Sequence, residues 1–162
     1  MATPPLELPA LDPATVAPSR GDPDYPKQFW SAVVGGDRRR LGDALGLTNF
    51  GVNLVRMPPG LQTALRHWHT KQDEFVFVLS GEVTVISDAG PQLLTAGMAA
   101  GFPAGKPDGH HIVNLSDSDA VILEIGDRAP ADEGEFPDVD MVWRNVDGDQ
   151  RYIYLHKNGT PY

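Results

Sequence analysis

The chain has 162 residues, a length that fits one domain and is too short for two full domains. Its composition is globular, with 41% hydrophobic and 22% charged residues. The formal net charge of −9 disfavours a nucleic-acid partner, which needs a basic face. The absence of cysteine excludes disulfides, Cys-ligated zinc, iron–sulfur clusters and thiol nucleophiles.

Proline dominates the N-terminal stretch. Seven of the 15 prolines fall within the first 26 residues, and each one fixes φ and removes a backbone donor. We therefore predict a Pro-rich arm over residues 1–30 that is neither helix nor central strand. This arm is either disordered, or extended and docked on the body or on a second subunit. In the docked case its anchors are Leu6, Leu8, Leu11 and Tyr25.

Short strands separated by turn residues follow the arm. Residues 37–45 form at most one short helix or turn, and we interpret the arginines at 38–40 as a solvated face. No long stretch carries a 3.6-residue apolar period. Strands separated by Gly, Asp and Pro favour an antiparallel sandwich or barrel, so the predicted fold class is all-β, with a barrel over residues 31–130. The clearest strands are 50–55, 74–79, 82–86 and 120–125.

The last part of the chain is predicted to be a C-terminal extension of the barrel domain. After Ile125 the sequence is polar and acidic, and it then gains the aromatic residues Trp143, Tyr152 and Tyr154. We predict that residues 131–162 pack on the barrel, with residues 151–155 as an edge strand.

Four of the five histidines lie in two short windows, His67/His69 and His110/His111. Side chains at i and i+2 of a strand point to the same face, so His67 and His69 project together as a chelating pair. Glu74 lies at an odd offset from them and cannot share that face on one continuous strand. We therefore expect residues 70–73 to turn the chain and Glu74 to open the next strand.

In that arrangement Glu74, Val76 and Val78 share one face of the second strand. The carboxylate lies beside the two imidazoles, and His110 or His111 supplies a fourth ligand from across the barrel. Three imidazoles and one carboxylate suit one divalent transition metal, and the spacing does not choose among Fe, Mn, Ni, Zn and Cu.

Two segments resemble the paired motifs of the cupin superfamily. The first runs from Gly60 through His67, His69 and Glu74 to Gly81, and its first gap holds six residues where the family pattern has five. The second runs from Gly97 through Pro103, Gly105 and His110 to Asn114, with four residues before the histidine where the pattern has two. The resemblance covers about residues 48–127.

The resemblance implies a double-stranded β-helix, or jelly-roll, barrel with a metal in its mouth. It implies the metal ligands His67, His69, Glu74 and His110, with His111 in reserve. His110 is preferred because it keeps the three-residue spacing to Asn114. Cupins of this size are commonly dimers that exchange or pair edge strands. The segments FPAGKPDGHH and HKNGTPY also resemble a group of small bacterial cupins, some of which are described as sugar-phosphate isomerases.

Three functions follow from this site. The first is a metal-dependent enzyme of isomerase type on a small polar or sugar-like molecule. For a phosphorylated substrate the mouth needs cations, and Lys106 is the best candidate, ahead of Arg56 and Arg66. The second is an O2-dependent dioxygenase with a mononuclear metal, whose inward wall is formed by Val76, Val78, Phe102 and Ile112. The third is a non-catalytic module that binds a small ligand or a metal.

The remaining expectations concern location and partners. The apolar runs are only a few residues long, and the first residues show neither the basic nor the apolar part of a secretory signal. We therefore expect a cytoplasmic homodimer that binds a small molecule and neither nucleic acid nor membrane.

Overall fold

The computed structural model describes residues 6–19, 25–33, 35–146 and 152–162. These residues are mostly in strands and turns, and the helical pieces are short: η1 (Pro13–Thr15), η2 (Lys27–Ala32) and α1 (Leu41–Ala44). The predicted all-β class is therefore confirmed. The strands are β1 (Asp37–Arg40), β2 (Phe50–Met57), β3 (Trp68–His69), β4 (Glu74–Ser80), β5 (Glu82–Ser87), β6 (Gly90–Thr95), β7 (Ala99–Phe102), β8 (His111–Val113), β9 (Ala120–Asp127), β10 (Gly134–Phe136), β11 (Met141–Asn145) and β12 (Tyr152–Leu155).

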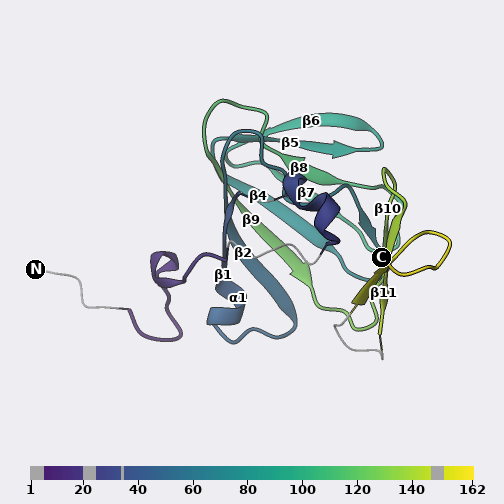
Figure 1. Ribbon diagram of the computed structural model, residues 1–162. Coiled ribbons are helices and arrows are strands. Elements are labelled where there is room, and N and C mark those ends of the chain that lie inside the picture. Colours follow the sequence, from purple (N-terminus) through teal and green to yellow (C-terminus); the bar gives the residue numbers. More distant parts are fainter. Residues whose placement is uncertain (1–5, 20–24, 34, 147–151) are drawn as a thin grey trace, which may run out of the picture.

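Two antiparallel sheets enclose the main core. The larger has the strand order β1-β2-β9-β4-β7, and the smaller has the order β6-β5-β8 (Figure 1). Buried aliphatic side chains from both sheets form one cluster, which identifies the two sheets as the walls of a barrel. The buried members of that cluster are Val55, Met57, Leu61, Val76, Val78, Val83, Val85, Ile112, Ala120 and Ile122.

The period-two pattern of β4 decides which side chains enter the barrel. Val78 is completely buried and Val76 nearly so, whereas Phe75 and Leu79 on the opposite face are 41% and 45% exposed. The predicted alternation of this strand is therefore confirmed. Each buried valine stabilises the fold by about 1.5–3 kcal/mol, and a slip of one residue would turn these valines to solvent.

The inward face of the larger sheet changes from apolar to polar toward one end. Val55, Ile122 and Val78 are paired across β2, β9 and β4 in the apolar part. Two residues further along, the paired inward residues are Asn53, Glu124 and Val76. One step beyond those, the paired residues are Gly51, Gly126 and Glu74. The barrel therefore has an apolar closed end and a polar end at which Glu74 opens β4.

The interpretation of the arginine run at 38–40 as a solvated face was wrong for Arg38 and Arg39, whereas Arg40 is exposed. These residues form β1, which pairs with β2 at the edge of the larger sheet. Arg38 turns inward and forms an ion pair with Glu124, with an Nη2–Oε2 distance of 3.0 Å. Arg39 turns outward and donates to the backbone carbonyls of Pro13, Ala14 and Val16 in the arm. Two consecutive arginines thus fasten the sheet edge, one to the barrel interior and one to the arm.

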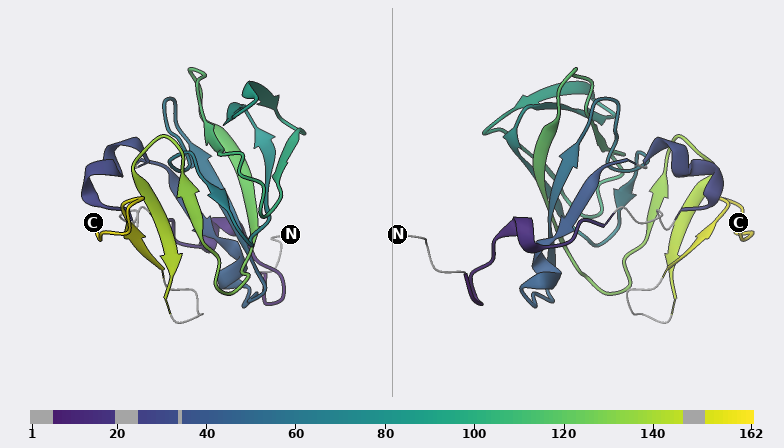
Figure 2. Two further views of the ribbon diagram at one scale, coloured as in Figure 1. Left: turned by 90° about the vertical axis from the view of Figure 1, so that its right-hand side faces the viewer. Right: turned by 60° about the vertical axis from the view of Figure 1, so that its left-hand side comes forward.

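The C-terminal strands form a third sheet in the order β12-β11-β10-β3, so the strand that carries His69 belongs to it. β12 is its edge strand, which confirms the strand predicted at 152–155, while residue 151 lies outside the described residues. Figure 2 shows this sheet beside the barrel, with η2 against it. Its aromatic core contains Phe136 and Trp143, and Tyr25 and Phe29 pack on that core.

Tyr25 is thus anchored as predicted, whereas Leu6 and Leu8 of the arm are exposed. No helix in the described part of the chain is long and apolar enough to cross a membrane.

Candidate metal centre

The two histidine windows meet in a short antiparallel bridge. The His67 amide donates to the His110 carbonyl at 3.0 Å, and the His110 amide donates to the His67 carbonyl at 2.8 Å. His69 follows in β3, and residues 70–73 lead the chain into β4 at Glu74. The predicted turn between His69 and Glu74 is therefore confirmed.

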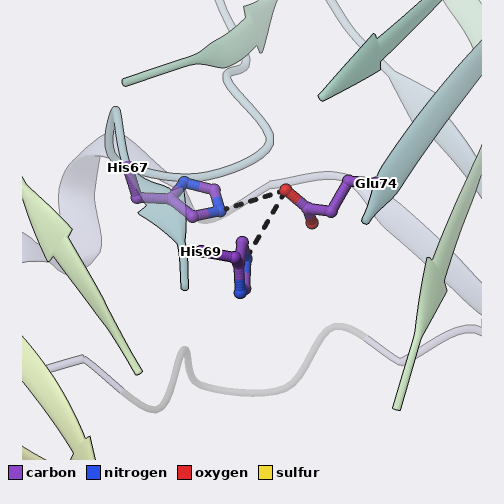
Figure 3. Close-up of side chains that lie close together, drawn as sticks. All are labelled: His67, His69 and Glu74. Atoms are coloured by element: carbon purple, nitrogen blue, oxygen red, sulfur yellow. Dashed lines mark ion pairs between the residues drawn. The ribbon is translucent and has the colours of Figure 1, made fainter. Parts of the chain in front are cut away.

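Three imidazoles converge on one oxygen atom of Glu74. The Oε2 atom lies 2.8 Å from Nε2 of His110, 3.5 Å from Nε2 of His69 and 3.6 Å from Nε2 of His67. Figure 3 shows His67 and His69 directed at this carboxylate. Among the described residues, His67, His69 and Glu74 offer ligand atoms that all lie within 4.8 Å of one another, so this cluster could hold a metal ion.

The second nitrogen of each imidazole is already committed to an acceptor. Nδ1 of His67 donates to the Leu65 carbonyl at 2.8 Å, and Nδ1 of His110 lies 3.3 Å from the Asp108 carbonyl. Nδ1 of His69 lies 2.6 Å from Oδ2 of Asp132. Because carbonyl and carboxylate oxygens only accept, Nδ1 of each ring carries a proton, and Nε2 is the nitrogen directed at Glu74, where it donates to the carboxylate when it is protonated and offers its lone pair to a metal when it is not. This tautomer is the one that a metal-binding histidine of this geometry requires, so the donor set fits a divalent transition metal.

The same cluster shifts the proton affinities of its members. Burial by itself would raise the pKa of Glu74, but hydrogen bonds from His110 and His67 outweigh it and hold this pKa well below its usual range. Burial by itself would lower the pKa of His67, and its contact with the Glu74 carboxylate outweighs that effect and raises this pKa. In the metal-free protein, a proton on the His67 imidazole therefore adds positive charge beside Glu74, where a metal cation would otherwise supply it.

Asp132 is a part of the site that the sequence analysis missed. It is 7% exposed, and its other oxygen accepts the Lys71 amide at 2.8 Å. It thereby fixes both the ring of His69 and the start of the turn that leads to Glu74. No spacing signal could have revealed it, because Asp132 reaches His69 only through the pairing of β10 with β3.

Aromatic rings enclose the histidines. Phe102 stacks on His110 with a centroid separation of 3.6 Å and an interplanar angle of 2°. Trp143 packs edge-on against His69 at 4.9 Å, and Phe136 lies 6.0 Å from His67. The C-terminal sheet therefore supplies one wall of the site, and the predicted inward position of Phe102 is confirmed.

A cavity of about 570 Å³ opens beside the cluster, and its lining includes His67, His69, Glu74 and His110. Glu124 lines the same cavity from β9 and is also absent from the sequence-based site. Burial, together with the charge of Glu74, raises the pKa of Glu124, and its ion pair with Arg38 opposes this increase. The cavity thus contains a second carboxyl group outside the candidate donor set.

None of the three cations expected at the mouth lines this cavity, and Lys106 instead borders a second cavity of about 30 Å³ together with His69 and His110. Lys106 is 64% exposed and pairs with Asp108 at 3.4 Å. Arg56 is held by Asp37 and Asp119 on the outer surface. Arg66 points away from the histidines, as predicted, and binds Asp138 and Asp88.

His111 and His110 differ in what they contact. The described ion pairs to Glu74 come from His67, His69 and His110, and His111 makes none of them. Within the described residues, Nδ1 of His111 is buried without a hydrogen-bond partner. The geometry therefore favours His110 over His111 as the histidine that completes the cluster.

A barrel of two antiparallel sheets with imidazoles and a carboxylate at its polar end defines a known class of proteins. Residues 53–126 match the family model described as a cupin domain. A sugar phosphate isomerase from a cupin superfamily, from Silicibacter pomeroyi, is 39% identical, with a TM-score of 0.88 over 95% of this chain and 96% of that one. The chain therefore belongs to the cupin superfamily, and the resemblance and the fold that it implies are confirmed.

Two further structures are similar to this chain. A protein from Acidithiobacillus ferrooxidans, provisionally described as a sugar phosphate isomerase, is 26% identical, with a TM-score of 0.74 over 83% of each chain. A polyketide cyclase from Streptomyces resistomycificus is 19% identical, with a TM-score of 0.61 over 86% of each chain, and this likeness shows the fold alone. No curated protein sequence matches the chain.

Proposed function

We propose that this protein is a metal-dependent enzyme of isomerase type that acts on a small sugar-like molecule with a carbonyl group. The observation that carries the proposal is a further, partly buried carboxyl group, Glu124, in the cavity beside the histidine–Glu74 cluster. The similarity to the isomerase from Silicibacter pomeroyi supports the same class of reaction.

His67, His69, Glu74 and His110 would hold one divalent transition metal. When bound, such a metal acts as a Lewis acid toward the oxygen atoms of a carbonyl substrate. The tautomers set by Leu65, Asp108 and Asp132 keep the Nε2 atoms available for this role. Phe102 and Trp143 limit the access of water to the same atoms.

Glu124 is the group that we assign to proton transfer. An aldose–ketose isomerisation removes a proton from the carbon next to the carbonyl and returns it to the neighbouring carbon. The Glu124 carboxylate would accept that proton while the C–H electron pair forms the carbon–carbon double bond of an enediolate, in which the former carbonyl oxygen takes the negative charge. Glu124 would then give the proton to the neighbouring carbon, while the hydroxyl proton passes to the former carbonyl oxygen. Its raised pKa brings its protonated and ionised forms closer in free energy near neutral pH. Arg38 holds both of its oxygens in position, at 3.2 and 3.0 Å.

Deuterium exchange tests this proposal directly. The protein is loaded separately with Zn(II), Mn(II), Fe(II) and Ni(II), and incubated in D2O with ribose 5-phosphate or fructose 6-phosphate. We expect NMR to show isomerisation together with deuterium at the carbon next to the carbonyl. Glu124→Gln should slow the exchange by roughly 10²–10⁴-fold while retaining the bound metal.

Glu82→Gln is the matched control, since Glu82 lies in β5 and does not line the cavity. Circular dichroism of both variants confirms that they are folded. Oxygen consumption by the Fe(II) form without any isomerisation would contradict the proposal and favour the dioxygenase. Ligand binding without turnover for every metal would favour the non-catalytic module.

A further inference from the structure

Three cations among the described residues line the cavity that contains the histidine cluster: Arg38, Arg40 and Arg128. Arg38 is committed to Glu124, and Arg128 to Asp43 and the Leu47 carbonyl. Arg40 differs from both, because it is exposed and its side chain forms no ion pair with any described residue. It is therefore the guanidinium at this cavity that is available to an incoming anion.

The strand register places Arg40 across the sheet from Glu74. Arg40 pairs with Asn53, Asn53 with Glu124, and Glu124 with Val76, so these side chains share the inward face. Glu74 occupies the next inward position on β4, beyond Val76. Three strand spacings separate β1 from β4, a distance of about 14 Å between their backbones. Because side chains stand roughly perpendicular to a sheet, the Arg40 and Glu74 side chains rise from the same face with that separation between them, which leaves room for a five- or six-carbon sugar phosphate.

The inward-facing residues that lie between Arg40 and Glu74 in the sheet are small or polar. Gly51 and Gly126 carry no side chain beside Glu74, and the Arg128 guanidinium lies over Gly51, where a Cβ would be 3.8 Å from Nη2. Glu124 lies on β9, between the strand of Arg40 and the strand of Glu74. A sugar phosphate that reaches from Arg40 to Glu74 therefore passes over the Glu124 carboxyl group, to which we assign proton transfer.

We propose that Arg40 binds the phosphate group of a phosphorylated sugar whose carbonyl end lies at the histidine–Glu74 cluster. This inference rests on the proposed function and names the class of substrate. It also replaces Lys106, which the sequence suggested for this role. A guanidinium suits it because its N–H groups can donate in parallel to two phosphate oxygens. In a cavity that also contains Glu74, Glu124 and Asp127, a dianion needs such a cation to bind.

Calorimetric binding to two matched pairs of probes tests the inference. The probes are ribose 5-phosphate against ribose, and fructose 6-phosphate against fructose, each with the Zn(II)-loaded protein. We expect the wild-type protein to bind the phosphorylated sugars more tightly than the plain sugars. Arg40→Gln should weaken binding of the phosphorylated sugars by roughly 10–100-fold and leave binding of the plain sugars unchanged.

Lys106→Gln removes the same charge from outside the cavity and should leave all four affinities unchanged. Among the described residues Arg40 has no ion-pair partner, so Arg40→Gln loses none of them and should fold, and its thermal unfolding is recorded as a check. If Lys106→Gln weakens phosphate binding and Arg40→Gln does not, the assignment of Arg40 is wrong while the proposed isomerase function and a phosphorylated substrate stand. If the wild type prefers neither phosphorylated sugar, both the inference and a sugar-phosphate substrate are overturned.

Discussion

Replacing Asp132 by Asn tests whether the tautomer of His69 controls metal binding. In the native protein, one Asp132 oxygen faces Nδ1 of His69 at 2.6 Å and the other accepts the Lys71 amide at 2.8 Å. An Asn side chain has one acceptor and one donor group in those two places. If its carbonyl keeps the Lys71 amide, its NH2 group faces Nδ1 of His69 and drives the ring proton to Nε2.

A proton on Nε2 removes the lone pair that faces Glu74, so His69 can no longer act as a ligand. The opposite amide orientation keeps the His69 contact but sets two donors against each other at Lys71. The substitution therefore loses one good contact in either orientation. Loss of such support for a metal-binding histidine lowers metal affinity by about 10–100-fold, or about 1.4–2.8 kcal/mol. Loss of the charge-assisted hydrogen bond costs about 1.5–3 kcal/mol of folding stability.

Competition with a chromophoric chelator measures the affinity, and urea unfolding of the metal-free protein measures the stability. Glu133→Gln is the matched control, because this neighbouring carboxylate is 41% exposed and its ion pair with Arg144 is 3.8 Å long. An Asp132→Asn variant that is folded and binds Zn(II) as tightly as the wild type would refute the tautomer argument.

Three further predictions concern stability. Asn114→Ala should lower the free energy of unfolding in urea by about 3 kcal/mol, because the buried Asn114 amide donates to the Met57 and Ser118 carbonyls at 2.7 and 2.8 Å. A loss below about 1 kcal/mol would contradict this prediction. Gly134→Ala should lower both the stability and the Zn(II) affinity, because the added Cβ would collide with the Trp143 ring and the Trp68 carbonyl. Wild-type values for both quantities in this variant would contradict tight packing at Gly134. The pH profile follows from the cluster: the lowered pKa of Glu74 adds stability above pH 4.5 that is lost as pH falls, and the raised pKa of His67 adds stability below pH 6.5 that is lost as pH rises. The thermal unfolding temperature of the metal-free protein, measured against pH, should therefore have a maximum between pH 4.5 and pH 6.5. Glu74→Gln should flatten this maximum, and an unchanged pH profile in that variant would contradict the pairing of Glu74 with His67.

Much of the fold follows from local patterns. The alternation in β4 predicts its two faces, and the polar residues 70–73 predict the turn before Glu74. His67 and His69 predict a chelating pair because a period of two fixes the direction of neighbouring side chains, and the resemblance to the cupin motifs implies that His110 joins them. These features depend on residues close together in the sequence, where backbone geometry alone decides which way a side chain points.

The residues that support the site depend instead on pairing between distant strands. Asp132 meets His69 only because β10 pairs with β3, and Arg38 meets Glu124 only because β1 and β9 flank β2. Nothing within a few residues of Asp132 distinguishes it from the other acidic residues of that segment. Nearness in the sequence does not identify the cation at the cavity either. Lys106 is near His110 in the sequence but does not line the cavity, whereas Arg40 lines it. The sequence by itself determined the barrel class and the common direction of His67 and His69, because strand periodicity is local, and its resemblance to the cupins added His110 at Glu74. The tertiary structure decided the tautomers, the second carboxyl group and the available cation, because strand register brings distant residues together.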